Sequence, residues 1–130
     1  MPNSTGQVAE LVAAGSANLE SNDLILRVYG MPLQSFGYFL VGTAFSPTGV
    51  IPPGSQGVIC LNSSIGRFNA LDEIRFSGTT GSFAFAPDWS SIATPNGATQ
   101  AMVGQTWCFQ AWHRDQASSN FSNGVSVTCE

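Results

Sequence analysis

The side chains that could do chemistry in this sequence are few, and their spacing matches no catalytic motif. His113 is the only histidine, so a metal site built from several histidines is excluded within one chain. No serine stands in a Gly-x-Ser-x-Gly elbow, and no phosphate-binding loop can form in the usual way because the chain has no lysine. The carboxylates Asp72, Glu73, Asp88 and Asp115 leave open a polysaccharide-cleaving enzyme that works with two carboxylates.

Binding is the chemistry that the aromatic residues favour. Sugars present apolar C–H faces ringed by hydroxyl groups, so a carbohydrate site needs an exposed aromatic ring beside polar side chains. Trp89 is the best candidate for that ring, because Asp88, Asn96 and Gln100 share its Pro- and Gly-containing segment. Tyr38 is a weaker candidate. The alternative interpretation is that Trp89 closes one end of the protein core.

No cofactor is predicted apart from a possible structural calcium ion. Asn69, Asp72 and Glu73 lie close together in the sequence and offer the oxygen ligands that Ca²⁺ prefers. Their spacing matches no EF-hand, and residues of these types also hydrogen-bond their own turns. No metal site of another kind is predicted.

Three cysteines are an odd number, so at least one thiol has no partner within the chain. Pairing the last two β-rich runs with Cys108 opposite Cys129 places Gln110 near Val127. This register predicts a Cys108–Cys129 disulfide and leaves Cys60 without a partner. The alternative is three reduced thiols.

Charge and composition exclude several classes of partner. The net charge is −4, and the only cationic side chains besides the histidine are Arg27, Arg67, Arg75 and Arg114. Nucleic acids and anionic membrane surfaces need clustered lysine and arginine, so neither is an expected partner. The chain also lacks a run of about 18 apolar residues, so no membrane span is predicted.

These residues must be positioned by β-strands. From residue 21 onward, short β-rich runs alternate with Gly, Pro, Asn and Ser, which is typical of an all-β domain. We predict one domain over residues 1–130, with an edge segment at 1–20 and a core at 21–130. Its fold is a two-sheet antiparallel β-sandwich of the Ig-like or jelly-roll type with about eight short strands. The expected strands are 23–29, 36–44, 57–61, 74–77, 82–86, 105–114 and 124–129, with 8–14 as an edge strand or a short helix.

The run 105–114 is the most informative of these strands. Trp107, Phe109 and Ala111 would point to one face, and Cys108 and Trp112 to the other. A strand that is apolar on both faces belongs in the middle of a sheet, with both tryptophans in the core. The segments 45–56, 63–70, 86–100 and 115–123 are expected to be loops.

Several stretches resemble, in their order and spacing, a domain that is common in secreted proteins of planctomycetes and myxobacteria. The stretches are NSTG, FGYFLVGT, PPGSQGVICL, IGRF, SGTTGSFAFA, GQTWCFQAWHRD and SNFSNGVSVT. The resemblance covers nearly the whole chain. It implies a bacterial protein that is exported to the extracellular space or the cell surface, and an accessory role at the C-terminal end of a larger protein.

The function predicted from these features is that of a non-catalytic accessory module that binds a polysaccharide or a cell-surface glycan. The first alternative is a structural or assembly domain for surface anchoring, sorting or fibre formation, whose partners are neighbouring copies or domains. The second alternative is the carboxylate-dependent polysaccharide-cleaving enzyme.

Overall fold

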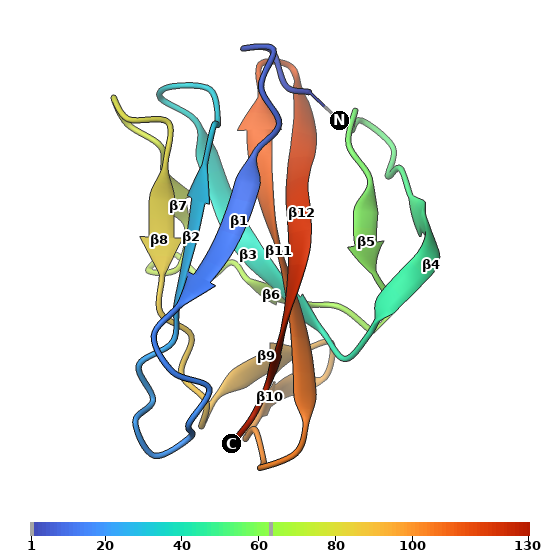
Figure 1. Cartoon of the computed structure of the whole chain (residues 1–130). Coiled ribbons are helices and arrows are strands. Elements are labelled where there is room, and N and C mark those ends of the chain that lie inside the picture. The colour runs from blue at the N-terminus through green and yellow to red at the C-terminus, as the bar shows by residue number, and fades with distance from the viewer. Residues whose placement is uncertain (1, 63) are drawn as a thin grey trace.

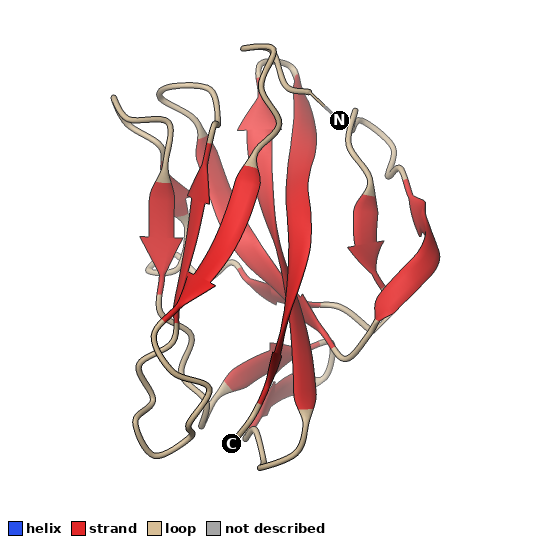
Figure 2. Ribbon diagram, in the orientation of Figure 1, coloured by secondary structure: helices blue, strands red, loops and turns tan. Residues whose placement is uncertain are grey.

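The computed structural model describes residues 2–62 and 64–130, which form twelve β-strands and no helix. Two antiparallel sheets face each other (Figure 1, Figure 2). The smaller sheet has the order β1-β2-β8, with the bounds Glu10–Ala14, Ile25–Tyr29 and Phe83–Phe85. The larger sheet contains β3, β6, β7, β11 and β12, with the bounds Phe36–Gly42, Gly66–Phe68, Arg75–Phe76, Thr106–Asp115 and Ser118–Thr128.

The larger sheet has the order β12-β11-β3-β6, and β7 also pairs with β3. Two hairpins stand outside the two sheets: β4 with β5, bounded by Phe45–Val50 and Ile59–Leu61, and β9 with β10, bounded by Ile92–Thr94 and Gly97–Thr99. The predicted all-β sandwich is therefore confirmed, with more strands than expected. None of the described residues belongs to a helix that could cross a bilayer.

Period-two alternation explains the core between the two sheets. In β2, Leu26 and Val28 are fully buried, whereas Ile25, Arg27 and Tyr29 are exposed. The pattern agrees with the faces that the sequence predicts for this strand. The edge position of the N-terminal segment is also observed, because β1 is an outer strand of the smaller sheet.

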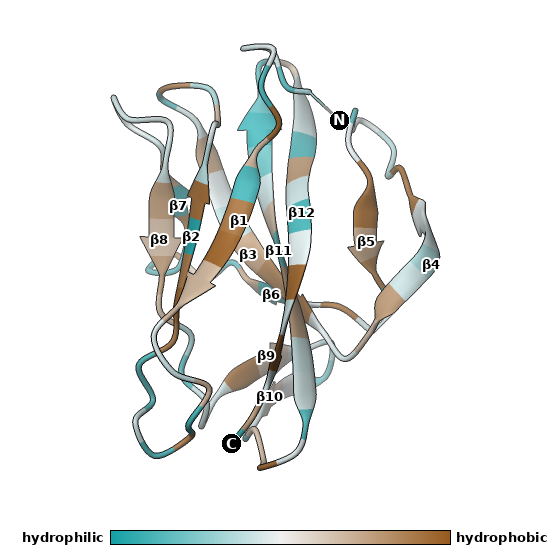
Figure 3. Ribbon diagram, viewed as in Figure 1, coloured by the Kyte–Doolittle hydropathy of each residue, from teal (hydrophilic) through white to brown (hydrophobic). Residues whose placement is uncertain are grey.

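Strand β11 lies between β12 and β3, as predicted for a central strand. Its inner face is buried, whereas its outer face is buried at Cys108 and Gln110 and open from Trp112 onward. Trp107, Phe109 and Ala111 pack in the core between the two sheets. Cys108 packs on the opposite face, in a second cluster with Leu61 of β5. The β4–β5 hairpin therefore forms a partial third layer over the outer face of the larger sheet. Figure 3 shows that β11 turns hydrophilic toward its C-terminal end.

The pairing of β11 with β12 differs from the predicted register. Cys108 lies opposite Ser126 instead of Cys129, a shift of three residues, and Gln110 lies opposite Gly124. An odd shift moves side chains to the other face of the sheet, so Cys129 packs in the core between the sheets while Cys108 faces the hairpin. The predicted Cys108–Cys129 disulfide is wrong, and all three cysteines are free thiols.

Four segments that were expected to be loops contain strands. Strand β4 lies within 45–56, β6 within 63–70, and β9 and β10 within 86–100. Strand β12 begins at Ser118, so only two residues remain of the loop expected at 115–123. The missed strands β6, β9 and β10 are only three residues long and lie among Gly, Pro and Asn residues, so their alternation did not stand out. Strand β4 tolerates Pro47 because it pairs on one side only, with an irregular register.

The position of β6 depends on Gly66. A Cβ atom at this position would lie 2.1 Å from the carbonyl oxygen of Ala93 in β9. Backbone contact this close requires glycine, which explains how the small β9–β10 hairpin crosses the larger sheet at β6. Because Gly66 faces β9, the adjacent Arg67 points to the opposite, outer face of the larger sheet.

Candidate functional site

The outer face of the larger sheet carries two stacked aromatic rings. Tyr38 of β3 lies opposite Trp112 of β11, and their ring centroids are 4.9 Å apart with an interplanar angle of 31°. Facing residues of an antiparallel pair lie on the same side of the sheet, so the β3–β11 register produces this contact directly. Both side chains are partly exposed.

Two further aromatic residues extend this surface along β3. Phe36 lies two residues before Tyr38 and therefore on the same face, opposite Phe76 of β7. The two phenyl rings are 4.9 Å apart, and the side chains are 57% and 46% exposed. We call the surface formed by Phe36, Tyr38, Phe76 and Trp112 the aromatic face.

Two arginines flank the aromatic face. The Arg114 guanidinium lies 5.5 Å from the centroid of the Trp112 ring, within the range of a cation–π contact. Arg67 of β6 lies opposite Leu40 of β3, on the same face as Tyr38. Neither guanidinium forms an ion pair with any residue in the described part of the chain.

A hollow of about 130 Å³ opens between the aromatic face and the β4–β5 hairpin. Its buried floor consists of Leu40 and Phe121, and Pro52 and Ile59 of the hairpin form one wall. The other lining residues are Tyr38, Arg67 and Trp112. An apolar floor with aromatic rings and one arginine at the rim is an arrangement that can bind ligands carrying both apolar and anionic groups.

The hairpin wall is held by Gln110, a fully buried polar residue of β11. Its Oε1 accepts a hydrogen bond of 2.9 Å from the Cys60 amide. Its Nε2 donates to the carbonyls of Val58 and Ser122 at 2.9 and 2.8 Å. One side chain thus connects β11, β12 and the hairpin, and this network makes the shape of the hollow rigid.

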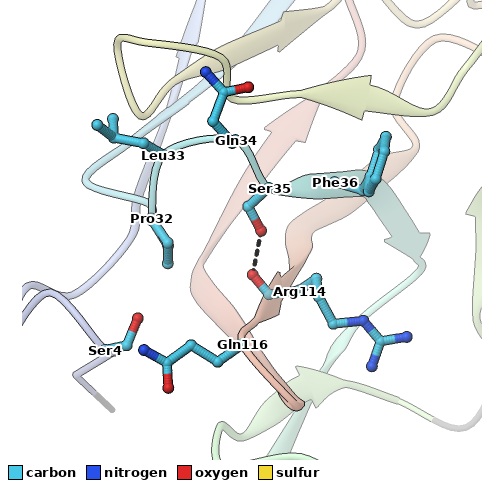
Figure 4. A pocket seen from close by; sticks show the side chains of 8 residues that line it. All are labelled: Ser4, Pro32, Leu33, Gln34, Ser35, Phe36, Arg114 and Gln116. Atoms are coloured by element: carbon cyan, nitrogen blue, oxygen red, sulfur yellow. Dashed lines mark hydrogen bonds between the residues drawn. The ribbon is translucent and has the colours of Figure 1, made fainter.

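A second, wider hollow of about 440 Å³ lies at the end of the sandwich (Figure 4). Figure 4 shows Ser4, Pro32 and Gln116 around its opening, while the Arg114 side chain extends away from them on the side of Phe36. Ser35 donates a hydrogen bond from its hydroxyl to the Arg114 carbonyl. Arg114 lines this hollow and contacts Trp112, so the hollow adjoins the aromatic face.

Trp89, the ring favoured by the sequence, is not a binding platform. It is 2% exposed and packs against Phe109 at 6.3 Å between ring centroids. Its amide donates to Asn22, and its carbonyl accepts from Ala101. Trp89 therefore closes one end of the core, which is the alternative interpretation, and the prediction of an exposed ring is wrong because three long-range contacts draw it inward.

The polar residues predicted beside Trp89 are exposed, but they do not line either hollow. Asp88 accepts hydrogen bonds from the amide and hydroxyl of Ser90, which lower the pKa of its carboxyl, as does a bond from Asn22. Asn96 and Gln100 lie at the turn of the β9–β10 hairpin and just after it. Of the predicted binding residues, only Tyr38 belongs to the aromatic face.

Asn69, Asp72 and Glu73 lie in the turn between β6 and β7, and their contacts are those of a turn. The Glu73 carboxylate accepts a hydrogen bond of 3.1 Å from the Ala70 amide, and the Asp72 carbonyl accepts one from Arg75. The described residues contain no group of three or more His, Cys, Asp and Glu side chains that could hold a metal ion. A calcium role for these residues stays a prediction.

His113 and Asp115 are buried at the same end of β11 as the wider hollow, but they do not line it. Burial lowers the pKa of His113, and its Nδ1 lies 3.1 Å from the Arg114 carbonyl. Both Asp115 oxygens accept from the Ser4 amide at 3.1 and 3.0 Å. Asp115 thus fastens the N-terminal segment, whereas the contact of His113 is to the neighbouring backbone. No aspartate or glutamate lines either of the two hollows.

Trp112 was expected in the core, and Phe36, Phe76, Arg67 and Arg114 were not singled out for binding. The sequence signal that pointed to this surface was the alternation in 36–44, which places residues 36, 38 and 40 on one face of the strand. It could not show which part of that face the hairpin leaves uncovered.

The fold and this surface together define an all-β sandwich whose larger sheet carries an aromatic face flanked by arginines. No family model matches the sequence, and no curated protein and no solved structure matches the chain. The resemblance to an accessory domain of exported bacterial proteins stays a prediction.

Proposed function

We propose that this domain is a non-catalytic accessory module that binds carbohydrate through the aromatic face. The observation that carries the proposal is the pair of partly exposed rings, Tyr38 and Trp112, beside a hollow with an apolar floor. Export to the extracellular space or the cell surface belongs to the proposal and rests on the sequence resemblance. The carboxylate-dependent enzyme is not proposed, because the carboxylate pair it needs has no place in either hollow.

Aromatic rings suit sugars for a physical reason. The C–H groups on one side of a sugar ring form an apolar surface, which packs against an indole or phenol ring while the hydroxyl groups remain in water. The hollow is small, so we expect part of one sugar residue to enter it. The rest of the chain would then lie along the aromatic face toward Phe36 and Phe76.

The surface is preorganised for such a ligand. Tyr38 and Trp112 project from two paired strands, and the Gln110 network fixes the hairpin wall beside them. A ligand that binds to side chains already held in place loses less affinity to ordering of the protein. Binding should therefore proceed without a change in the sandwich.

Affinity electrophoresis of the purified domain through gels that contain single polysaccharides tests this proposal. We expect retardation by at least one polysaccharide, and Trp112→Ala should weaken binding about fivefold, because stacking of this kind contributes about 1 kcal/mol. Trp112→Phe should keep part of the affinity. Tyr29→Ala is the matched control, since Tyr29 is an exposed aromatic residue on the outer face of the smaller sheet.

Circular dichroism should show that each variant is folded. Wild-type protein that migrates freely through every gel would disprove the proposed function. So would a folded Trp112→Ala variant that is retarded as strongly as the wild type.

A second candidate function is assembly with copies of the same domain, and strand β4 favours it. This strand pairs with β5 alone, and Val50 and the following Ile51 are 59% and 55% exposed. A free strand edge with apolar side chains can pair with the same edge of another copy. Sedimentation at increasing concentration should then show a dimer that Val50→Lys abolishes, whereas a strict monomer would exclude this candidate.

A further inference from the structure

The positions of Arg67 and Arg114 beside the aromatic face indicate that the carbohydrate ligand is negatively charged. We propose that the face recognises an acidic polysaccharide, a chain of sugars that carry carboxylate groups, with Arg67 and Arg114 binding those carboxylates. This inference rests on the proposed carbohydrate-binding function and specifies its ligand.

Charge complementarity is the first argument. The chain has a net charge of −4, yet two of its four arginines flank one surface and no carboxylate lines the adjoining hollows. Neither Arg67 nor Arg114 has a carboxylate partner among residues 2–62 and 64–130. A local positive site on an acidic protein favours an anionic ligand there and disfavours one elsewhere on the surface.

The other two arginines show the contrast. Arg75 is used by the fold, because its Nε and Nη1 donate to the carbonyls of Ala84 and Asp72 at 2.9 and 2.7 Å. Arg27 is exposed on the outer face of the smaller sheet and lines neither of the two hollows. Of the four arginines, Arg67 and Arg114 are the two that line one of the described hollows, and neither forms an ion pair with the described residues.

The strand registers place the two guanidinium groups on opposite sides of the ring pair. Arg114 follows Trp112 by two residues on β11, while Arg67 lies on β6 opposite Leu40, which follows Tyr38 by two residues on β3. The two arginines therefore lie diagonally across the Tyr38–Trp112 pair. A sugar chain stacked on these rings passes within reach of both arginines.

The chemistry favours a carboxylate on the sugar. A guanidinium forms two parallel hydrogen bonds with a carboxylate, and this paired geometry adds specificity to the charge attraction. Arg114 is already oriented by its contact with Trp112. Stacking on the rings and pairing with the arginines together distinguish an acidic sugar chain from a neutral chain, which lacks the charge, and from an acidic peptide, which lacks the apolar sugar face.

The experiment compares soluble probes of similar chain length by isothermal titration calorimetry at low salt. Polygalacturonate and alginate carry carboxylates, dextran sulfate carries sulfates, dextran is neutral, and poly-glutamate is an acidic peptide. We expect a carboxylated polysaccharide to bind at least about tenfold more tightly than the other three classes. Raising the ionic strength from about 0.05 M to about 0.5 M should weaken that binding, since the arginines are at the protein surface.

The variants Arg67→Gln and Arg114→Gln should each lower the affinity for the carboxylated polysaccharide at least about fivefold, and Arg27→Gln is the matched control that should not. Equal affinity for dextran, with no effect of either variant, would overturn the inference and leave the proposed function standing. Preference for dextran sulfate or poly-glutamate would also overturn it. If the domain bound none of these probes and no neutral polysaccharide, both the inference about the acidic ligand and the proposed carbohydrate-binding function would be disproved.

Discussion

The side-chain amide of Asn123 both accepts a hydrogen bond from the backbone of Leu11 and donates one to it. The Leu11 amide donates to Asn123 Oδ1 at 2.7 Å, and Asn123 Nδ2 donates to the Leu11 carbonyl at 3.1 Å. Leu11 lies in β1 at the edge of the smaller sheet, and Asn123 lies in β12 at the edge of the larger sheet. The amide therefore takes the place of a neighbouring strand and connects the two sheets along one side of the sandwich.

We predict that Asn123→Ala lowers the free energy of unfolding by about 1–3 kcal/mol, because two partly buried backbone groups lose their partner. Urea denaturation measures this change, and amide hydrogen exchange at Leu11 should become faster. Asn96→Ala, in an exposed turn, serves as control. Unchanged stability of Asn123→Ala would mean that water replaces the amide at no cost.

Replacement of Gln110 by methionine should destabilise the domain by about 2–4 kcal/mol. The methionine side chain has similar size but leaves the Cys60 amide and the Val58 and Ser122 carbonyls without their partner. Chemical denaturation measures the loss. The variant should also bind the carbohydrate ligand more weakly, since the hairpin wall of the hollow is no longer held. A Gln110→Met variant as stable as the wild type would show that the hydrogen bonds of Gln110 contribute little to the free energy of unfolding.

The thiols provide a direct test of the corrected cysteine pairing. Cys108 and Cys129 are 3% and 2% exposed, and burial raises the pKa of both thiols, whereas Cys60 is half-buried. Without reductant, a thiol reagent should titrate three thiols in the unfolded chain. In the folded protein Cys60 should react first, because the other two are shielded and protonated. Detection of a single thiol after unfolding would show instead that two of the cysteines form a disulfide.

Stability should depend on pH through His113. Burial lowers its pKa below the ordinary value of 6.5, only partly offset by the Arg114 carbonyl and the Asp115 carboxylate. The unfolded chain then binds more protons than the folded one, so stability is present above about pH 6.5 and falls as the pH is lowered through the pKa of the folded state. Thermal unfolding of wild type and His113→Gln between about pH 7.5 and 5 should show a smaller pH dependence for the variant. If the stability of the wild type and of His113→Gln depended equally on pH, titratable groups other than His113 would be responsible.

Local patterns predicted the parts of the fold that depend on neighbouring residues. The alternation of Leu26 and Val28 with exposed residues indicated both the strand β2 and its buried face. The apolar residues on both faces of 105–114 indicated a central strand. The three-residue strands β6, β9 and β10 gave no such signal, because one or two alternations also occur by chance in a loop.

The sequence by itself determined that the chain is all-β, and which side chains of its longer strands share a face, because side-chain direction alternates with every residue. Only the tertiary structure decided the β11–β12 register that separates Cys108 from Cys129, and the burial of Trp89. It also decided which part of the outer face stays open beside the hairpin, where Tyr38 and Trp112 meet. These features depend on contacts between residues far apart in the chain, and the free energy of packing them selects one pairing among several that satisfy the same local pattern.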